Sequence, residues 1–319
     1  MTDDNAANAK IIDFPNLQKL PVDNSWITIG NFDGVHRGHQ YLINNLVEKA
    51  QREGNPVIVV TFFPNPTDFF QPNTELFYLS TPAEKEELLC QMGVDRVINF
   101  RFDRDFANLS AFDFLFALKD KLGLRKLVVG EDFVLGRDRQ GTLPVIKSIG
   151  DTLDFSVETV SPLREDGEAI SSTRIRRCLD EGDLTCVKEL LGRPFRISGV
   201  VTRGSDRGAR IGLPTANMTH WVKQKLPAIG VYATRVLLHE KIYYGITNVG
   251  LRPTFEDQTL PNIETHILDF DGNIYGEQLK VEFIQKIRDE QKFSGVDAFL
   301  AQIARDKATA RRIFNDDQP

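Results

Sequence analysis

Two histidines three positions apart give the strongest chemical signal in this chain. Of its 319 residues only five are histidines, and His36 and His39 follow a short apolar run that ends at Gly30. A strand that delivers a Gly/His loop to a helix N-terminus can bind phosphate, because the first-turn N–H groups lack partners within the helix. Two neutral imidazoles one turn apart could donate hydrogen bonds to nucleotide phosphates, with Gly38 allowing close backbone approach. The alternative is a pair of surface or capping histidines.

A second candidate phosphate site is the hydroxyl-rich segment Ser171-Ser172-Thr173-Arg174. Hydroxyl groups, helix N-terminal N–H groups and the guanidinium groups of Arg174 and Arg176 would suit a leaving pyrophosphate. A basic helix with an ordinary N-cap is the alternative explanation.

A third candidate is the Gly/Arg-rich run Arg207-Gly208-Ala209-Arg210-Ile211-Gly212-Leu213-Pro214-Thr215-Ala216-Asn217. It is not a Walker A loop, because Gly-Lys-Ser/Thr is missing. It could still wrap a phosphate chain, and Thr215 and Asn217 carry oxygens of the kind that Mg²⁺ accepts. Composition alone favours a simple Gly/Pro-rich turn here.

The elements that would position the first two segments alternate between strand and helix. Apolar runs predict strands at 27–29, 57–62, 94–100, 126–129 and 155–160, and periodicity predicts helices at 39–52, 81–92, 110–122, 143–149, 171–181 and 184–191. This order indicates right-handed βαβ units and a parallel sheet, whose ligands bind at the carboxyl ends of the strands. Segments 30–39, 63–66 and 130–136 fall at such ends.

After about residue 193 the pattern changes to short alternating β-runs with Gly and Pro between them. Strands are predicted at 197–202, 231–238, 242–248, 263–270 and 279–284, with Asp271-Gly272-Asn273 as a hairpin turn between the last two. This pattern predicts a small antiparallel barrel. A closing helix at 296–313 would plug the barrel or cover its side. The expected organisation is a frayed leader at 1–25, an α/β domain at 26–186 and a barrel domain at 187–319.

Composition restricts partners and compartment. The net charge of −6 gives no general attraction to nucleic acid or to an anionic membrane, so ATP would have to be bound locally. No apolar run is long enough to span a membrane, and the N-terminus lacks the apolar region of a signal peptide. Cys90, Cys178 and Cys186 lack metal-ligand spacing, so we expect them to be reduced and buried in a cytoplasmic protein. We expect neither a nucleic-acid nor a membrane partner, and a monomer or weak homo-oligomer.

The string Gly30-Asn31-Phe32-Asp33-Gly34-Val35-His36, with Gly130-Glu131-Asp132-Phe133 and the Ser-Ser-Thr-Arg segment, resembles a nucleotidylyltransferase. It is similar to the adenylyltransferase half of the bacterial bifunctional riboflavin kinase/FAD synthetases. The resemblance implies a Rossmann-like domain that transfers AMP from ATP to FMN and releases pyrophosphate. It assigns catalysis to His36, His39 and Arg174, ATP binding to Gly30, Asn31, Phe32, Gly38, Ser171, Ser172, Thr173 and Arg176, and flavin binding to Phe62 and Asp132.

The barrel half resembles the riboflavin kinase domain of the same family. The similar strings are Gly212–Asn217, in which Leu213 stands where the family has Phe, together with 248–255, 264–270 and 288–293. The resemblance implies that Glu264 takes the proton from the ribityl hydroxyl and that Thr215 and Asn217 bind Mg²⁺ and ATP phosphates. It further implies phosphate contacts by Arg207, Gly208, Gly212 and Pro214, and a flavin lid with Asn248, Arg252, Thr254, Arg288 and Phe293.

The chain departs from the family pattern at four positions on the presumed FMN side. Phe63 and Asn65 stand where the family often has Glu and His, and Val134 and Leu135 where it commonly has Arg and Phe. These changes affect FMN affinity or pocket shape rather than ATP chemistry.

The sequence therefore predicts a bifunctional enzyme that phosphorylates riboflavin with ATP and Mg²⁺ and then adenylylates the FMN. Three other functions are open. One half could have lost catalysis, the first half could act on another acceptor, or the chain could be a flavin carrier without activity. A different acceptor would leave the barrel motifs unexplained, and the presence of His36, His39 and Glu264 favours an enzyme over a carrier.

Overall fold

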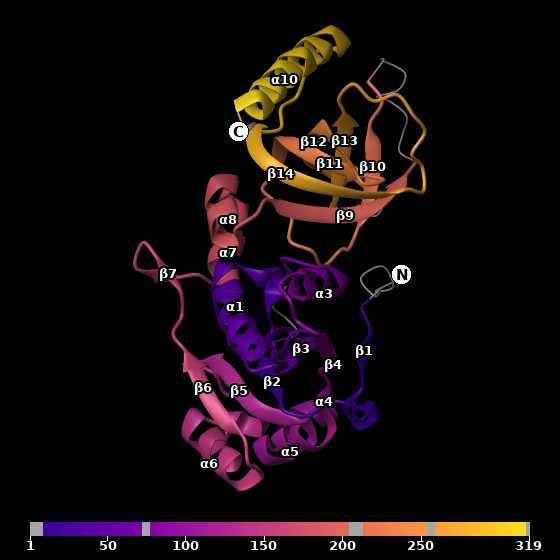
Figure 1. The fold of residues 1–319 in the computed structure, drawn as a ribbon. Coiled ribbons are helices and arrows are strands. Elements are labelled where there is room, and N and C mark those ends of the chain that lie inside the picture. Colours follow the sequence, from indigo (N-terminus) through magenta and orange to yellow (C-terminus); the bar gives the residue numbers. More distant parts are fainter. Residues whose placement is uncertain (1–8, 72–76, 204–212, 254–258, 317–319) are drawn as a thin grey trace. The chain divides into compact units, whose positions relative to one another are not determined.

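The computed structural model describes residues 9–71, 77–203, 213–253 and 259–316, and Figure 1 shows their fold. The chain divides into two compact units, Met1–Ser172 and Thr173–Pro319. Each unit has its own sheet and its own hydrophobic core. Within the described ranges, none of the helices has the length and apolar character needed to cross a membrane.

The first unit contains a six-stranded sheet in the order β1-β4-β3-β2-β5-β6. Every neighbouring pair is parallel, as the alternating pattern predicts. The strands are β1 (Ile11–Ile12), β2 (Ser25–Ile29), β3 (Val57–Phe63), β4 (Arg96–Arg101), β5 (Leu124–Gly130) and β6 (Ser156–Val160). The expectation of a frayed leader is wrong for residues 11–17, because β1 pairs with β4 and Leu17 is buried in the core.

Helices cover both faces of this sheet (Figure 1). On one face, α1 (Arg37–Arg52) and α3 (Pro82–Gln91) pack on Trp26, Val57 and Val59. On the other face, α5 (Ala111–Leu122) and α6 (Leu143–Leu153) pack on the alternate residues of the same strands, such as Ile27 and Ile58. The strands read as continuous apolar runs because both of their faces are buried. Short elements complete the unit: α2 (Pro66–Phe70), α4 (Arg104–Ala107), β7 (Arg164–Glu165), β8 (Glu168–Ala169), η2 (Phe14–Asn16), η3 (Asp33–Val35) and η4 (Arg137–Arg139).

The strand order places a ligand site beside β2. The chain moves from β2 outward through β3 to β4 and then returns to β5 on the opposite side of β2. Such a reversal opens a crevice at the carboxyl ends of the strands, where open α/β sheets bind ligands. Residues 30–39, which we call the histidine loop, follow β2 at this edge.

The second unit begins with two helices, α7 (Ser172–Glu181) and α8 (Leu184–Leu191). Helix α7 is tied to the barrel through the Leu179 carbonyl, which accepts from Ala228 N at 2.9 Å, and through an ion pair between Asp180 and Lys225. Nearly all of α7 therefore belongs to this unit.

Six antiparallel strands then close into a barrel in the order β10-β13-β12-β11-β14-β9. They are β9 (Phe195–Thr202), β10 (Ala216–His220), β11 (Gly230–Leu238), β12 (Lys241–Pro253), β13 (Thr259–Ile267) and β14 (Gln278–Arg288). The barrel was predicted, but β10 was not recognised as a strand. Its sequence, Ala-Asn-Met-Thr-His, lacks the apolar alternation that identifies the other five.

The predicted hairpin at Asp271-Gly272-Asn273 is wrong. In the barrel, β13 pairs with β10 and β12, whereas β14 pairs with β11 and β9. Both edges of β13 are therefore occupied by other strands. Residues 268–277 form a connection across the barrel rather than a tight turn, because closure of the barrel decides the pairing and not the local turn chemistry.

The closing helix α10 (Val296–Asp316) covers the side of the barrel (Figure 1). Ala310 and Phe314 pack on Val231, Ala233 and Ile246 of β11 and β12. The opposite face of these strands points into the barrel. There the buried hydroxyl groups of Thr234, Thr247 and Thr265 form a row of hydrogen bonds of 2.8 and 2.9 Å. Of the two predicted positions for this helix, the covering one is correct.

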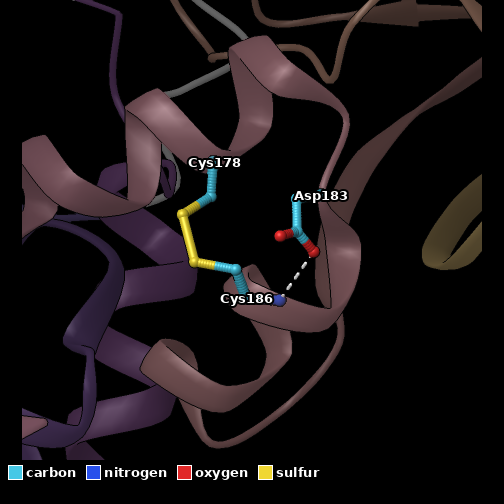
Figure 2. Close-up of a disulfide and its surroundings, with 3 residues drawn as sticks. All are labelled: Cys178, Asp183 and Cys186. Atoms are coloured by element: carbon cyan, nitrogen blue, oxygen red, sulfur yellow. Dashed lines mark hydrogen bonds between the residues drawn. A yellow bond between two sulfur atoms is a disulfide. The ribbon is translucent and has the colours of Figure 1, made fainter. Parts of the chain in front are cut away.

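The prediction of three reduced, buried cysteines is wrong. Cys178 of α7 and Cys186 of α8 form a disulfide (Figure 2), and Cys90 is an exposed free thiol. Asp183 caps α8 by accepting a hydrogen bond from Cys186 N at 2.9 Å, which fixes the turn between the two helices. A spacing of eight residues carries no disulfide signal of its own, since the turn that brings the sulfurs together becomes visible only in three dimensions.

Candidate active sites

The histidine loop has an unusual backbone that neighbouring residues hold in place. Phe32, Gly34 and Val35 all have positive φ angles, of 48°, 76° and 40°. A positive φ is costly for a β-branched residue such as Val35. The buried carboxylate of Asp33 compensates by accepting hydrogen bonds from Leu79 N at 2.9 Å and Ser80 N at 3.4 Å. Gly34 N in turn donates to Ser80 Oγ at 3.1 Å.

The two histidines lie against each other at the N-terminus of α1. Their rings are stacked with centroids 3.6 Å apart, and His39 N donates to His36 Nδ1 at 3.3 Å. His36 Nδ1 therefore carries no proton, and its neutral form is protonated on Nε2. His39 Nδ1 is buried and has no hydrogen-bond partner among the described residues, which also favours the Nε2–H tautomer. Both rings are thus suited to donate from Nε2.

Burial keeps His39 neutral. Desolvation lowers the pKa of His39 well below its ordinary value of 6.5, and the nearby charges of His36 and Lys85 lower it further. A neutral Nε2–H donor needs no change of protonation to stabilise negative charge that builds up on a phosphate oxygen.

Two glycines in this loop are required by space. A Cβ atom on Gly30 would lie 2.9 Å from the Phe32 ring, and one on Gly38 would lie 3.2 Å from both the His36 ring and the Ile170 carbonyl. The backbone at these two positions is therefore packed closely against Phe32, His36 and Ile170, and a side chain there would displace them.

The Ser/Thr/Arg segment contacts this loop through the Ser172 hydroxyl group. Ser172, at the start of α7, donates from Oγ to the Asp33 carbonyl at 3.0 Å. Ser171 precedes it and is half-buried. Thr173, Arg174 and Arg176 follow on α7 in the second unit, where Thr173 is exposed and the two arginines are half-buried.

The predicted flavin contacts of the first unit lie at two different places along the sheet edge. Phe62, next to the last residue of β3, belongs to an aromatic cluster, and its ring centroid lies 5.8 Å from that of Phe102 and 5.4 Å from that of Phe106. Asp132 is exposed in the turn after β5. Asn31, whose side chain is exposed, donates to Asn65 Oδ1 at 3.3 Å.

Three of the four departures from the family pattern have local contacts. Asn65 caps α2 by accepting from Thr67 N at 2.9 Å, and its own N–H donates to Tyr78 Oη at 2.8 Å. Phe63 packs on the Tyr78 ring, and Leu135 forms a backbone bridge with Gly141. Nothing in the structure explains Val134.

The structure adds a residue that the sequence did not indicate. Lys85 of α3 is only 7 % exposed and donates to Thr61 Oγ1 at 2.7 Å and to the Asn31 carbonyl at 3.1 Å. A cavity of about 10 Å³ lies between Lys85, Asp33, Tyr78 and Ser80. Burial lowers the pKa of Lys85 to about 8, although the charge of Asp33 opposes this effect. Helical periodicity placed a lysine here on a helix but gave no sign of its burial.

In the barrel, Glu264 lies in the middle of a row of side chains. The Cα atoms of Asn217 and Asn248 pair with that of Glu264 from the strands on either side, and Val231 pairs with Asn248. Directly opposed residues point to the same face of a sheet. Asn217, Glu264 and Asn248 therefore lie side by side on the face that α10 covers.

This face contains a cavity of about 270 Å³, which we call the first barrel cavity. It is lined by Glu264, Asn248 and Thr215 on the barrel side and by Phe299 and Ile303 of α10. Glu264 is half-buried and accepts a hydrogen bond from Asn262 Nδ2 at 2.7 Å.

A second barrel cavity, also of about 270 Å³, lies at one end of the barrel. Pro214 and Thr215 border it, opposite the 270–275 segment that had been predicted to be a hairpin. Thr215 is shared by both cavities. His266 lies next to this junction, with its Nδ1 2.8 Å from the Pro214 carbonyl oxygen. Desolvation lowers the pKa of its imidazole.

Arg288 and Phe293 lie at the rim of the first barrel cavity. The Arg288 guanidinium group binds both carboxylate oxygens of Asp306, at 2.8 to 3.1 Å, and Asp306 is only 1 % exposed on α10. Arg288 also lies over the Phe293 ring, at 5.8 Å from its centroid. Asn248 Nδ2 donates to Glu290 Oε1 at 3.3 Å, which links β12 to the segment after β14. Glu290 falls within the predicted lid string 288–293 without having been assigned a role, and the sequence did not indicate Asp306.

The remaining predicted residues lie outside the described structure. Arg207, Gly208, Gly212 and Thr254 belong to the omitted ranges, and Arg252 is described only as backbone of β12.

A magnesium ion would have to be held here by few protein ligands. Within the described ranges, no group of three His, Cys, Asp or Glu side chains could hold a metal. Asn217 in β10 offers an amide oxygen opposite Glu264, and Thr215, just before β10, offers a hydroxyl in the cavity that Glu264 also lines. This oxygen-only set fits Mg²⁺, which prefers oxygen ligands and completes its shell with water and substrate phosphates.

Comparisons with known proteins found relatives for both units. The family model for FAD synthetase matches residues 19–174, and that for riboflavin kinase matches residues 191–314. The bifunctional riboflavin kinase/FMN adenylyltransferase of Escherichia coli K12 is 40 % identical over 306 residues, covering 95 % of this chain and 97 % of its own. The enzymes of the same name from Pseudomonas fluorescens and Bacillus subtilis are 39 % and 35 % identical, over 90 % and 92 % of this chain and 92 % and 93 % of their own.

A solved structure also matches nearly the whole chain. A crystal structure described as a macrolide-efflux protein from Streptococcus pneumoniae has a TM-score of 0.87 and 31 % identity, covering 95 % of this chain and 98 % of that protein. Both halves of the chain thus match one family in a single continuous alignment. The chain belongs to the family of bifunctional riboflavin kinase/FMN adenylyltransferases.

Proposed function

We propose that this chain makes FAD from riboflavin in two ATP-dependent steps, phosphorylation to FMN in the barrel and adenylylation of FMN in the α/β unit. Family membership supports both activities. The structural observation that supports the kinase most directly is the position of Thr215, which borders both barrel cavities. One cavity can hold the acceptor and the other the nucleotide, with the transferred phosphate at their junction.

In the kinase step, riboflavin binds in the first barrel cavity and ATP extends from the second towards Thr215. Glu264 lines the acceptor cavity and takes the proton from the ribityl hydroxyl. The hydroxyl oxygen then forms a bond to the γ-phosphorus while the bond to the departing ADP oxygen breaks. Because phosphoryl transfer depends mainly on positioning and charge stabilisation, these side chains and the ATP-bound ion suffice.

Thr215 and Asn217 are the residues that would hold Mg²⁺ together with the ATP phosphates. When bound there, the ion neutralises charge on the phosphate oxygens. Arg207, Gly208, Gly212 and Pro214 would complete the phosphate contacts.

A lid over the flavin would include Asn248, Arg252, Thr254, Arg288 and Phe293. The Arg288–Asp306 ion pair supports part of this assignment, because it ties the end of β14 to α10 beside the first barrel cavity.

In the adenylylation step, a phosphate oxygen of FMN attacks the α-phosphorus of ATP and pyrophosphate leaves. His36 and His39 donate from Nε2 to the phosphate oxygens, and their tautomers support this role. Arg174, Arg176 and the hydroxyls of Ser171, Ser172 and Thr173 stabilise the pyrophosphate, while Gly30, Asn31, Phe32 and Gly38 shape the ATP site. Phe62 and Asp132 would contact the flavin.

We propose an α/β domain at 26–186, to which residues 11–17 also belong, and a barrel domain at 187–319. The interval between the two family matches, 175–190, contains this boundary. We also propose that the chain acts in the cytoplasm, because both steps consume ATP. As its oligomeric state we propose a monomer or weak homo-oligomer. The cysteines do not support the compartment as we had expected, since two of them form a disulfide.

The test is to incubate the purified chain with riboflavin, ATP and Mg²⁺ and to separate the flavins by chromatography. We expect FMN to appear first and FAD to follow. FMN without FAD would restrict the chain to the kinase, and the absence of both products would favour a flavin carrier. If the chain makes FAD from added FMN but makes no FMN from riboflavin, it has only the adenylyltransferase activity.

A further inference from the structure

Lys85 is a buried cation at the ligand-binding edge of the α/β sheet. It lies on α3, and its ammonium group reaches Thr61 near the end of β3 and the Asn31 carbonyl just after β2. Thr61 Oγ1 donates to the same Asn31 carbonyl at 3.1 Å. Both acceptors of the ammonium group are neutral oxygens, so the charge is not neutralised by direct hydrogen bonding to a carboxylate.

We propose that Lys85 is a positioning residue for FMN adenylylation, which holds the Asn31 end of the histidine loop and places a fixed positive charge behind it. This inference rests on the adenylyltransferase function proposed for the first unit. Because Lys85 is only 7 % exposed, it acts on the nucleotide through the loop rather than by direct contact.

A buried charge is costly to keep. An uncharged side chain of similar length would fill the same space between α3 and the sheet at a lower desolvation cost. Buried titratable groups with strongly shifted pKa values are concentrated at functional sites. Lys85 lies at the switch point of the sheet, behind the segment that binds the ATP phosphates in the proposed function.

Several charged or titratable groups face Lys85 from the elements packed around it. Asp33 of η3 stabilises the ammonium form, whereas His36 and His39 at the start of α1 share its surroundings. Glu84 is the buried neighbour of Lys85 on α3, and Tyr78 lies across the small cavity. Desolvation outweighs the attraction of Asp33, which is why the pKa of Lys85 falls to about 8.

The proposal predicts a pH dependence that a structural lysine would not produce. Below pH 8 Lys85 is charged and strengthens ATP binding at the loop. As the pH rises above about 8 the charge is lost, so the KM for ATP in FAD formation should increase. If the charge is removed by substitution, the KM for ATP should be high at all pH values. It should then show no further rise as the pH increases above 8.

The experiment compares Lys85→Met with the wild-type chain. Met removes both the charge and the hydrogen bonds, while Lys85→Gln keeps a donor for the Asn31 carbonyl without the charge. Lys147→Met, an exposed lysine on α6, is the matched control. For each protein we would measure riboflavin phosphorylation, the KM for ATP and kcat of FAD formation from added FMN between pH 6 and 9.5, and the melting temperature.

For Lys85→Met we expect the KM for ATP to rise on the order of tenfold, the size of effect that one nearby charge has on a triphosphate. Kinase activity should be unchanged and the melting temperature no lower than in the wild type. Lys85→Gln should reverse part of this rise in KM, because it keeps a donor for the Asn31 carbonyl, but its KM should still not change as the pH passes 8.

An unchanged KM and an unchanged pH profile in both variants would overturn the proposal. Loss of kinase activity together with FAD formation in both variants would also overturn it, because it would assign Lys85 a structural role in the whole chain. If the wild type makes no FAD from FMN, the proposed function itself fails, and this outcome is separate from the other two.

Discussion

Glu264 is a single carboxylate within a barrel strand, and its sequence position alone does not distinguish a catalytic base from a solvent-facing residue. Its surroundings in the barrel do. It lies between two asparagines in the cross-strand row, lines the first barrel cavity and has one oxygen oriented by Asn262.

We expect Glu264→Gln to lower riboflavin phosphorylation by about 10²- to 10⁴-fold, because it removes the base but keeps the shape of the side chain. Conversion of added FMN to FAD should be unchanged, since that reaction takes place in the other unit. Chromatography of the products measures both. Glu282→Gln, a carboxylate on β14 that pairs with Arg235, should leave both activities intact. Equal loss of both activities in a folded Glu264→Gln protein would show that the sites are not independent.

For His39 we expect the opposite pattern, in which FAD formation falls and riboflavin phosphorylation is kept. His39→Ala should lower FAD formation by about 10²- to 10³-fold through loss of a preorganised donor, while FMN still accumulates from riboflavin. His239→Ala, at the exposed turn between β11 and β12, is the matched control.

The wild-type pH profile tests the protonation state of His39. Because burial lowers its pKa, the active neutral form persists as the pH falls through 6.5. The acid limb of FAD formation should therefore lie below pH 6.5. The same shift makes the unfolded chain bind more protons below pH 6.5, so His39 makes the fold less stable as the pH falls. An acid limb at or above pH 6.5 would contradict the role of a neutral His39.

At the level of elements, helix α7 carries both a predicted phosphate-binding residue and one cysteine of the disulfide to α8. Arg174 lies one turn before Cys178 on α7, and the disulfide fastens this helix to α8. Cys178 is buried and Cys186 half-buried, so the bond lies inside the helix pair (Figure 2).

We expect the denatured, unreduced chain to react with one equivalent of thiol reagent, at Cys90, and the reduced chain with three. Cys186→Ser should lower the free energy of unfolding of the second unit by about 2 to 3 kcal/mol, the entropic value for closing a short loop. Urea unfolding in the absence of a reductant measures this difference. Cys90→Ser should have no effect, and three reactive thiols before reduction would show that the disulfide does not form.

At the level of the whole molecule, the two units have separate cores, which makes them separable in function. The α/β unit is stabilised on both faces of its sheet, and the barrel by its interior and by α10. A substitution in one unit should therefore leave the fold of the other intact.

A mixture of the two single variants tests this separation. Neither Glu264→Gln nor His39→Ala alone should make FAD from riboflavin, but the mixture should. His39→Ala would release FMN, which Glu264→Gln would then adenylylate after a lag that shortens at higher protein concentration. Chromatography over time follows the flavins. A mixture that stops at FMN would show that FMN does not pass through solution between two chains.

Much of this architecture could be predicted from local patterns. Apolar runs and helix caps located β2 to β6 and the longer helices of the α/β unit to within a few residues, because both faces of a parallel strand are buried and the caps satisfy free N–H groups. They missed β1 and the short elements α2, α4, β7 and β8. The loop from Gly30 to His39 was indicated by its order of residue types, which the close approach of a phosphate restricts. The segment around Thr215 was indicated only by its resemblance to the riboflavin kinase domain, because its composition alone favoured a simple turn.

Other features depend on contacts between residues that are far apart in the chain. Asp271-Gly272-Asn273 has the composition of a hairpin turn, but barrel closure gives β13 and β14 other partners. Lys85 looks like a surface lysine of a helix until β2 and β3 cover its ammonium group. Cys178 and Cys186 meet because two helices fold back on each other. Sequence patterns report local conformation and the chemistry of short motifs. Strand partners, burial and the charges within a site are set by packing between distant segments, and they become defined only when the chain has folded.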